Sequence, residues 1–85
     1  MITFTQNVSE SDRRVLETFN YRCIIDFRRY DTIHHIIPKS MGGTDDDENK
    51  VPLCNHDHRR IHDSGATNWI EYLQDLREKR INDLR

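Results

Sequence analysis

The sequence has few apolar residues, few cysteines and no long hydrophobic run. Its 85 residues allow one small domain, residues 1–85, and only 34% of them are hydrophobic, so the core of this domain must be thin. Domains of this size and polarity usually need a bound metal or an oligomer for stability. Two cysteines, Cys23 and Cys54, are too few for the disulfide framework of a small secreted domain.

Signals for membranes or export are also missing. No stretch is long and apolar enough to span a bilayer, and the N-terminus lacks the pattern of a signal peptide. We therefore expect a cytoplasmic protein with no membrane partner.

The overall charge does not indicate a nucleic-acid binder. The net charge is −2, from 13 basic and 15 acidic side chains. Four of the acids are consecutive, however, and the remainder of the chain holds 13 basic against 11 acidic residues. The charge is therefore patterned. The acidic run itself, residues 45–48, is predicted to be a solvated loop.

Hydrophobic spacing and capping residues predict an α+β fold. Helices are expected over residues 10–19 after the N-cap Ser9, over 55–63 before Gly65, and over 68–84 after the cap Asn68. Trp69 is expected to anchor that last helix in the core. Strands are predicted at 21–25 and 31–37, with a short extended segment at 51–54. Residues 1–7 fit either an edge strand or a loose tail.

All five histidines lie between residues 33 and 62. His58 and His62 are one helical turn apart and share a helix face. Together with one histidine from the preceding strand, they supply the three imidazoles of an open metal site. Neighbouring side chains of a strand point to opposite faces, so His34 can bind the metal while His35 stays free as a general base. His56 is predicted to point away from this site.

The same window carries a family resemblance. It reads HHIIPxSxGG, then Asn49, then VPLCxxxHxxxH, and over about residues 13–62 it resembles the HNH, or ββα-metal, endonucleases. The resemblance implies a treble-clef-like ββα centre, with motif core 21–63. It further implies that Asn49 braces the loop and orients the base His35, and that one divalent metal ion (Zn, Mg, Mn or Ni) binds to His34, His58 and His62.

The chain departs from this family at the cysteines. Many members carry two CxxC knuckles for a structural zinc, whereas here the second cysteine of each knuckle is replaced, by Asp26 and by Asp57. Carboxylates are harder donors than thiolates. No structural zinc is therefore expected at Cys23 and Cys54, whose thiols should be free and buried.

The functional hypothesis is a metal-dependent endonuclease that hydrolyses DNA phosphodiester bonds with little sequence discrimination. Phosphate contacts are predicted for Arg59, Arg60, Lys39 and Lys50. The small size resembles phage-encoded members that work beside packaging or recombination proteins in the cytosol of a bacterium or infected host. Two alternatives stay open: a non-catalytic, zinc-stabilised module that binds nucleic acid or protein, and a colicin-type toxin domain, which would need delivery machinery.

Overall fold

The first helix begins where its capping residue predicts. In the computed structural model, which describes residues 8–84, α1 spans Glu10–Thr18. The Ser9 hydroxyl accepts a hydrogen bond from the Asp12 amide at 3.0 Å, which satisfies one of the free N–H groups of the first turn. The predicted helix over 10–19 and its cap are confirmed. The predicted edge strand or tail at residues 1–7 lies outside the described residues.

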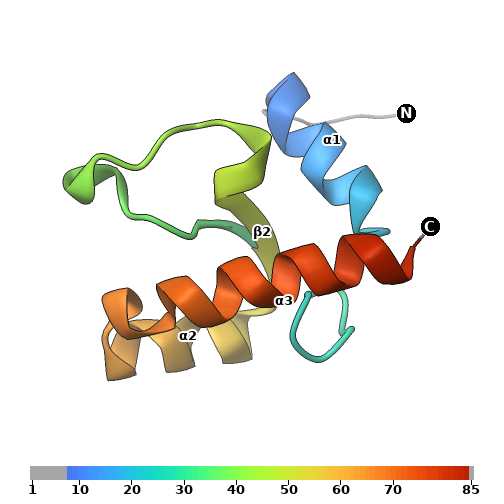
Figure 1. Cartoon of the computed structure of the whole chain (residues 1–85). Coiled ribbons are helices and arrows are strands. Elements are labelled where there is room, and N and C mark those ends of the chain that lie inside the picture. Colours follow the sequence, from blue (N-terminus) through green and yellow to red (C-terminus); the bar gives the residue numbers. More distant parts are fainter. Residues whose placement is uncertain (1–7, 85) are drawn as a thin grey trace.

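Two short strands and a helix form the centre of the fold (Figure 1). β1 (Thr32–His35) pairs antiparallel with β2 (Lys50–Leu53), and α2 (Asn55–Ser64) follows at once. α2 ends at Gly65, where φ is 95°, a backbone conformation that glycine adopts without strain. The strands predicted at 31–37 and 51–54 and the helix at 55–63 are confirmed, and β1 is shorter than expected. The fold is α+β, as predicted.

The predicted strand at residues 21–25 is wrong. These residues form a tight loop, with one isolated bridge between Arg22 and Arg29. Asn20, Tyr21 and Phe27 have positive φ values of 59°, 60° and 64°, which are incompatible with an extended strand. The loop of residues 20–30 is instead closed by a hydrogen bond from the Phe27 amide to the Cys23 carbonyl at 3.0 Å. Both free cysteines are buried, as predicted.

The C-terminal helix starts later than predicted. A 3-10 turn, η3 (Ala66–Trp69), precedes α3 (Ile70–Asp83). Asn68 does not cap α3, because its side-chain amide donates to the Ser64 carbonyl at 2.9 Å. Trp69 is only partly buried, and its indole N–H donates to the Ser64 hydroxyl at 2.7 Å. The fully buried residue of α3 is Leu73, so Leu73 has the central packing position that the sequence assigned to Trp69.

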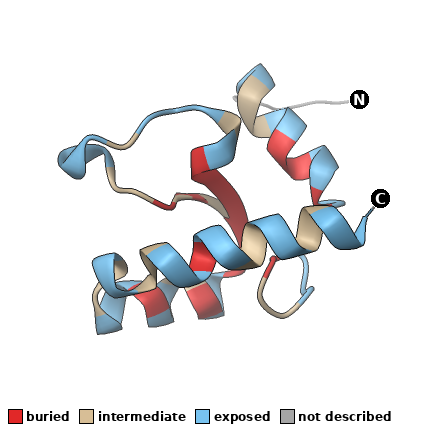
Figure 2. Cartoon of the chain, viewed as in Figure 1, coloured by how far each residue is buried: buried red, intermediate tan, exposed pale blue. Residues whose placement is uncertain are grey.

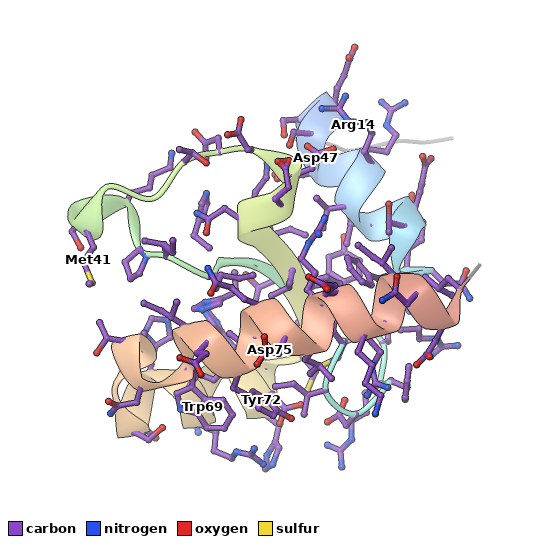
Figure 3. All side chains as sticks on the ribbon, viewed as in Figure 1. Arg14, Met41, Asp47, Trp69, Tyr72 and Asp75 are labelled. Atoms are coloured by element: carbon purple, nitrogen blue, oxygen red, sulfur yellow. The ribbon has the colours of Figure 1, made fainter. Side chains whose placement is uncertain are left out.

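The core lies where α1, α2 and α3 meet the sheet, and Figure 2 shows buried residues on their inner faces. In the view of Figure 1, α3 passes in front of β2, and Arg80 donates to the Ile24 carbonyl at 2.9 Å. α1 is tied to the 3-10 turn η2 (Asp47–Asn49) by the ion pair between Arg14 and Asp47, at 2.8 Å (Figure 3). Within residues 8–84, no helix has the length and hydropathy needed to span a bilayer.

Candidate metal centre and active site

Three imidazoles converge between β1 and α2. His34 is presented by β1, while His58 and His62 lie one turn apart on α2. The two helix histidines bring their Nε2 atoms to 3.0 Å, and one ring nitrogen from each of the three histidines lies within 4.8 Å of the other two. The structure therefore brings together the three residues predicted to bind the metal.

The chemistry of this cluster fits a metal ion. His34 is 5% exposed, and its Nε2 has no hydrogen-bond partner among residues 8–84. Burying such a nitrogen without a partner is costly. Burial, together with the neighbouring His58 and His62, lowers the pKa of His34 to about 4. Burial, together with His62, also lowers the pKa of His58. These two rings are therefore neutral at pH 7, which is the form that binds metals.

His35 lies beside the cluster and lines the same surface hollow. It is half-buried, and the alternation of β1 separates its ring from that of His34. The hollow is formed by Ile33, His34, His35, Pro38, His58, His62 and Ala66. An unliganded imidazole thus lies next to a candidate metal site, with open access from solvent.

Asp45 holds His35, which the sequence did not predict. Its carboxylate accepts a hydrogen bond from His35 Nε2 at 2.8 Å and pairs with Lys39 at 2.9 Å. Hydrogen bonds from Lys39 and His35 lower the pKa of Asp45 to about 2. Asp45 belongs to the acidic run that was predicted to be only a solvated loop. The available signal was the Gly42-Gly43 turn, which returns the chain after it toward β1.

That turn depends on glycine at residue 43. A Cβ atom there would come within 1.7 Å of the Ile37 carbonyl oxygen, so any other residue would displace the backbone. Gly42 is left-handed, with φ of 87°, at the end of the 3-10 turn η1 (Lys39–Met41). Met41 lies at the far tip of this loop (Figure 3). The double glycine therefore allows residues 44–46 to return beside residues 35–38.

Asn49 holds the base of the same loop together. Its side chain is buried, accepts a hydrogen bond from the Ile37 amide at 2.8 Å, and donates to the carbonyls of Ile37 and Thr44 at 3.0 and 2.9 Å. The Asn49 carbonyl also accepts from the Ile36 amide at 2.8 Å. One residue thus ties together both ends of the loop that follows His35, in line with the predicted brace.

The predicted DNA contacts differ in their surroundings. Arg59 and Arg60 are exposed on α2, and the Arg60 guanidinium lies 5.3 Å from the centre of the Trp69 ring. Lys39 is exposed, although paired with Asp45. Lys50 is 2% exposed, and its ammonium pairs with Asp12 of α1 at 2.8 Å. This placement does not fit the predicted DNA contact, because β2 directs Lys50 inward against α1.

Comparison with known proteins agrees with this geometry. Residues 21–64 match the family described as HNH endonuclease. The chain belongs to the HNH endonuclease family. Metal dependence is typical of HNH enzymes, and family membership supports nuclease activity on DNA.

A restriction enzyme shares the HNH region. Over 49 residues, this chain is 45% identical to the type IV methyl-directed restriction enzyme EcoKMcrA of Escherichia coli (strain K12). The similar stretch covers 56% of this chain and 18% of EcoKMcrA. The chain therefore spans less than a fifth of the length of that relative.

Proposed function

We propose that this HNH domain hydrolyses phosphodiester bonds in DNA, with His35 as the general base and a divalent metal on His34, His58 and His62. The observation that carries the proposal is the unpartnered Nε2 of buried His34, directed toward two further imidazoles. Three nitrogen donors favour zinc or nickel over magnesium or manganese. A divalent cation at these residues supplies Lewis-acid stabilisation of the phosphoryl and leaving-group oxygens.

His35 has a ring nitrogen available for proton transfer. A carboxylate only accepts hydrogen bonds, so the contact with Asp45 assigns the proton to His35 Nε2. Nδ1 then keeps the lone pair, and we assign it as the atom that takes a proton from the attacking water. Asp45 orients the ring and stabilises the imidazolium that forms, while Asn49 holds the loop in position.

The exposed basic side chains of α2 and of the loop that follows His35 would bind the DNA backbone. Arg59 and Arg60 extend from the same helix as His58 and His62, and Lys39 is exposed on the loop that follows His35. Guanidinium and ammonium groups contact phosphates independently of base sequence. We therefore expect binding with little sequence preference.

Nicking of supercoiled plasmid tests this proposal. Chelated protein should be inactive, and zinc, nickel, manganese or magnesium added separately should show which ion restores cutting. His58→Ala should remove activity, whereas His56→Ala, an exposed histidine on the same helix, should retain it. Absence of nicking with every ion, in a folded protein that binds plasmid, would contradict the proposal.

The alternative is a non-catalytic, zinc-stabilised binding module, in which the contacts from His35 through Asp45 to Lys39 only fix the loop. In that case His35→Ala would lower stability but leave the binding of metal and DNA unchanged. The two readings therefore differ at His35.

A further inference from the structure

A second group of metal-binding side chains lies away from the three histidines. It consists of two thiols and two carboxylates, one pair from the loop of residues 20–30 and one from the start of α2: Cys23, Asp26, Cys54 and Asp57. One donor atom from each of these residues lies within 4.8 Å of the other three. The residues form two Cys-x-x-Asp units, 23–26 and 54–57, that are far apart in the sequence.

The spacing of the donors matches a tetrahedral ion. A zinc ion with Zn–S of about 2.3 Å and Zn–O of about 2.0 Å separates a bound sulfur from a bound oxygen by roughly 3.5 Å. Asp57 Oδ2 lies 3.3 Å from Cys23 Sγ and 3.2 Å from Cys54 Sγ. Asp26 Oδ2 lies 3.4 Å from Cys54 Sγ. These three separations therefore match those between ligands of one tetrahedral ion, and the remaining pairs of donors lie within 4.8 Å of each other.

The negative charge of the two carboxylates at this cluster also favours a bound cation. Asp57 is 2% exposed, and a buried carboxylate is unfavourable without a close positive partner. The nearest basic groups are beyond the distance of a direct hydrogen bond. The Arg60 guanidinium is 3.7 Å from Asp57, and that of Arg28 is 3.6 Å from Asp26. Two thiols, with one proton each, cannot neutralise two adjacent carboxylates.

We propose that Cys23, Asp26, Cys54 and Asp57 form a closed structural metal site that takes zinc. This proposal replaces the expectation, drawn from the sequence, that the lost cysteines remove such a site. Carboxylate oxygen is itself a zinc ligand, so aspartate can take the place of each missing cysteine. The two thiolates disfavour magnesium and calcium, which prefer oxygen donors throughout.

The site would join two parts of the chain that are distant in the sequence. Cys23 and Asp57 are 34 residues apart, and the loop of residues 20–30 contains three positive-φ residues. Asp57 immediately precedes His58, so an ion here would also fix the beginning of the helix that presents His58 and His62. Asp26 keeps 27% of its side chain exposed, which leaves an entry path for the ion.

Cobalt substitution tests the site without any measurement of DNA cleavage. The full chain would be stripped with a chelator, kept reduced, and titrated with Co²⁺. We expect thiolate-to-cobalt charge-transfer absorption that saturates at one equivalent and disappears when Zn²⁺ is added. His34→Asn should retain this absorption, because imidazoles do not produce it.

Variants at the aspartates complete the test. Asp26→Asn should weaken cobalt binding by more than the roughly 10–100-fold typical of losing a group that only hydrogen-bonds to a ligand. Asp26→Cys should restore tight binding, and Asp63→Asn, an exposed acid on the same helix, should have no effect. Folded parent protein without thiolate-to-cobalt absorption, or an Asp26→Asn variant with unchanged affinity, would overturn the proposal in favour of a metal-free cluster of thiols and carboxylates.

Discussion

At the scale of single residues, strand alternation separates two adjacent histidines into different chemical settings. His34 is buried among imidazoles, whereas the ring of His35 is held by an exposed carboxylate. We propose that the same residue type acts as a metal ligand at one position and as a proton acceptor at the next. This division is the basis of the proposed mechanism.

The buried His34 gives the metal-free protein a specific response to acid. Its pKa is lowered to about 4 in the folded chain, against 6.5 for an ordinary histidine. As the pH falls below 6.5, His34 becomes protonated in the unfolded chain but stays neutral in the folded chain. The contribution of His34 to the free energy of unfolding is therefore fully present above pH 6.5 and decreases as the pH falls toward 4. The slope is at most about 1.4 kcal/mol per pH unit for this group, and His58 adds to it in the same direction.

Urea unfolding of chelated protein at pH 7 and pH 4.5 measures this response. His34→Asn should lose less stability between the two pH values than the parent. The carboxylates of Asp45 and Asp47, whose pKa values are lowered to about 2, lose their contributions only below about 3.8, outside this window. Equal losses in parent and variant would show that His34 is not buried in its neutral form.

Asp45 should matter for turnover more than for substrate binding. Asp45→Asn keeps a side chain of the same shape but removes the charge that stabilises a protonated His35. We expect a lower kcat with KM nearly unchanged, and a smaller loss than for His35→Ala. Asp46→Asn, in the same exposed run, is the matched control. A parent-like kcat for Asp45→Asn would mean that this carboxylate only fixes the loop.

At the scale of elements, α2 connects the proposed functions. It presents His58 and His62 to the metal centre and the two arginines to solvent, and Asp57 in its first turn reaches the second cluster. This helix and its end were predictable, because the 58/62 spacing and Gly65 act locally. Residues 21–25 were mistaken for a strand because the course of the loop of residues 20–30 depends on positive φ at Asn20 and Tyr21 and on contacts with distant α2.

Substitution of Lys50 should affect stability alone, whereas substitution of the two α2 arginines should affect DNA binding alone. Lys50→Ala removes the buried partner of Asp12, which is itself 30% exposed, and should lower the free energy of unfolding by about 1–3 kcal/mol. Its DNA affinity should not change. Arg59→Ala with Arg60→Ala should leave stability nearly unchanged and reduce the slope of log K against log[salt] by about 0.9 per lost phosphate contact.

Denaturant unfolding and DNA binding at several salt concentrations check both halves of this prediction. The sequence predicted a phosphate contact at Lys50. In the structure α1 packs against β2 and Asp12 pairs with the Lys50 ammonium, so Lys50 faces inward. A salt slope reduced by Lys50→Ala would contradict this assignment.

At the scale of the whole molecule, two candidate ion sites compensate for a small core. The apolar centre is formed by few side chains, and α3 contributes a single fully buried residue, Leu73. The histidine site was predictable because its residues follow a motif in one window. The positions of the Cys-x-x-Asp cluster also followed from the family resemblance, but the sequence predicted no zinc there. The spacing of the four donors is visible only once the loop of residues 20–30 lies against α2.

Zinc should therefore stabilise the folded chain through two sites whose contributions can be measured separately. An ion that binds only the folded state at 100 times its Kd adds about 2.7 kcal/mol per site. Zinc should raise the Tm of the chelated parent, His58→Ala should retain part of that rise, and adding Cys23→Ala should abolish it. A complete loss of the zinc effect in His58→Ala alone would assign all of the stabilisation to the histidine site.

The central claim is that metal binding and proton transfer are divided between His34 and His35. The most direct test measures both properties on one His35→Ala preparation, with His56→Ala as control: metal affinity by calorimetric titration, and nicking of supercoiled plasmid with the activating ion. We predict parent-like metal affinity with nicking reduced by about 100-fold or more, the scale of losing a general base. Nicking at the parent's rate, or loss of metal affinity together with activity, would contradict this division.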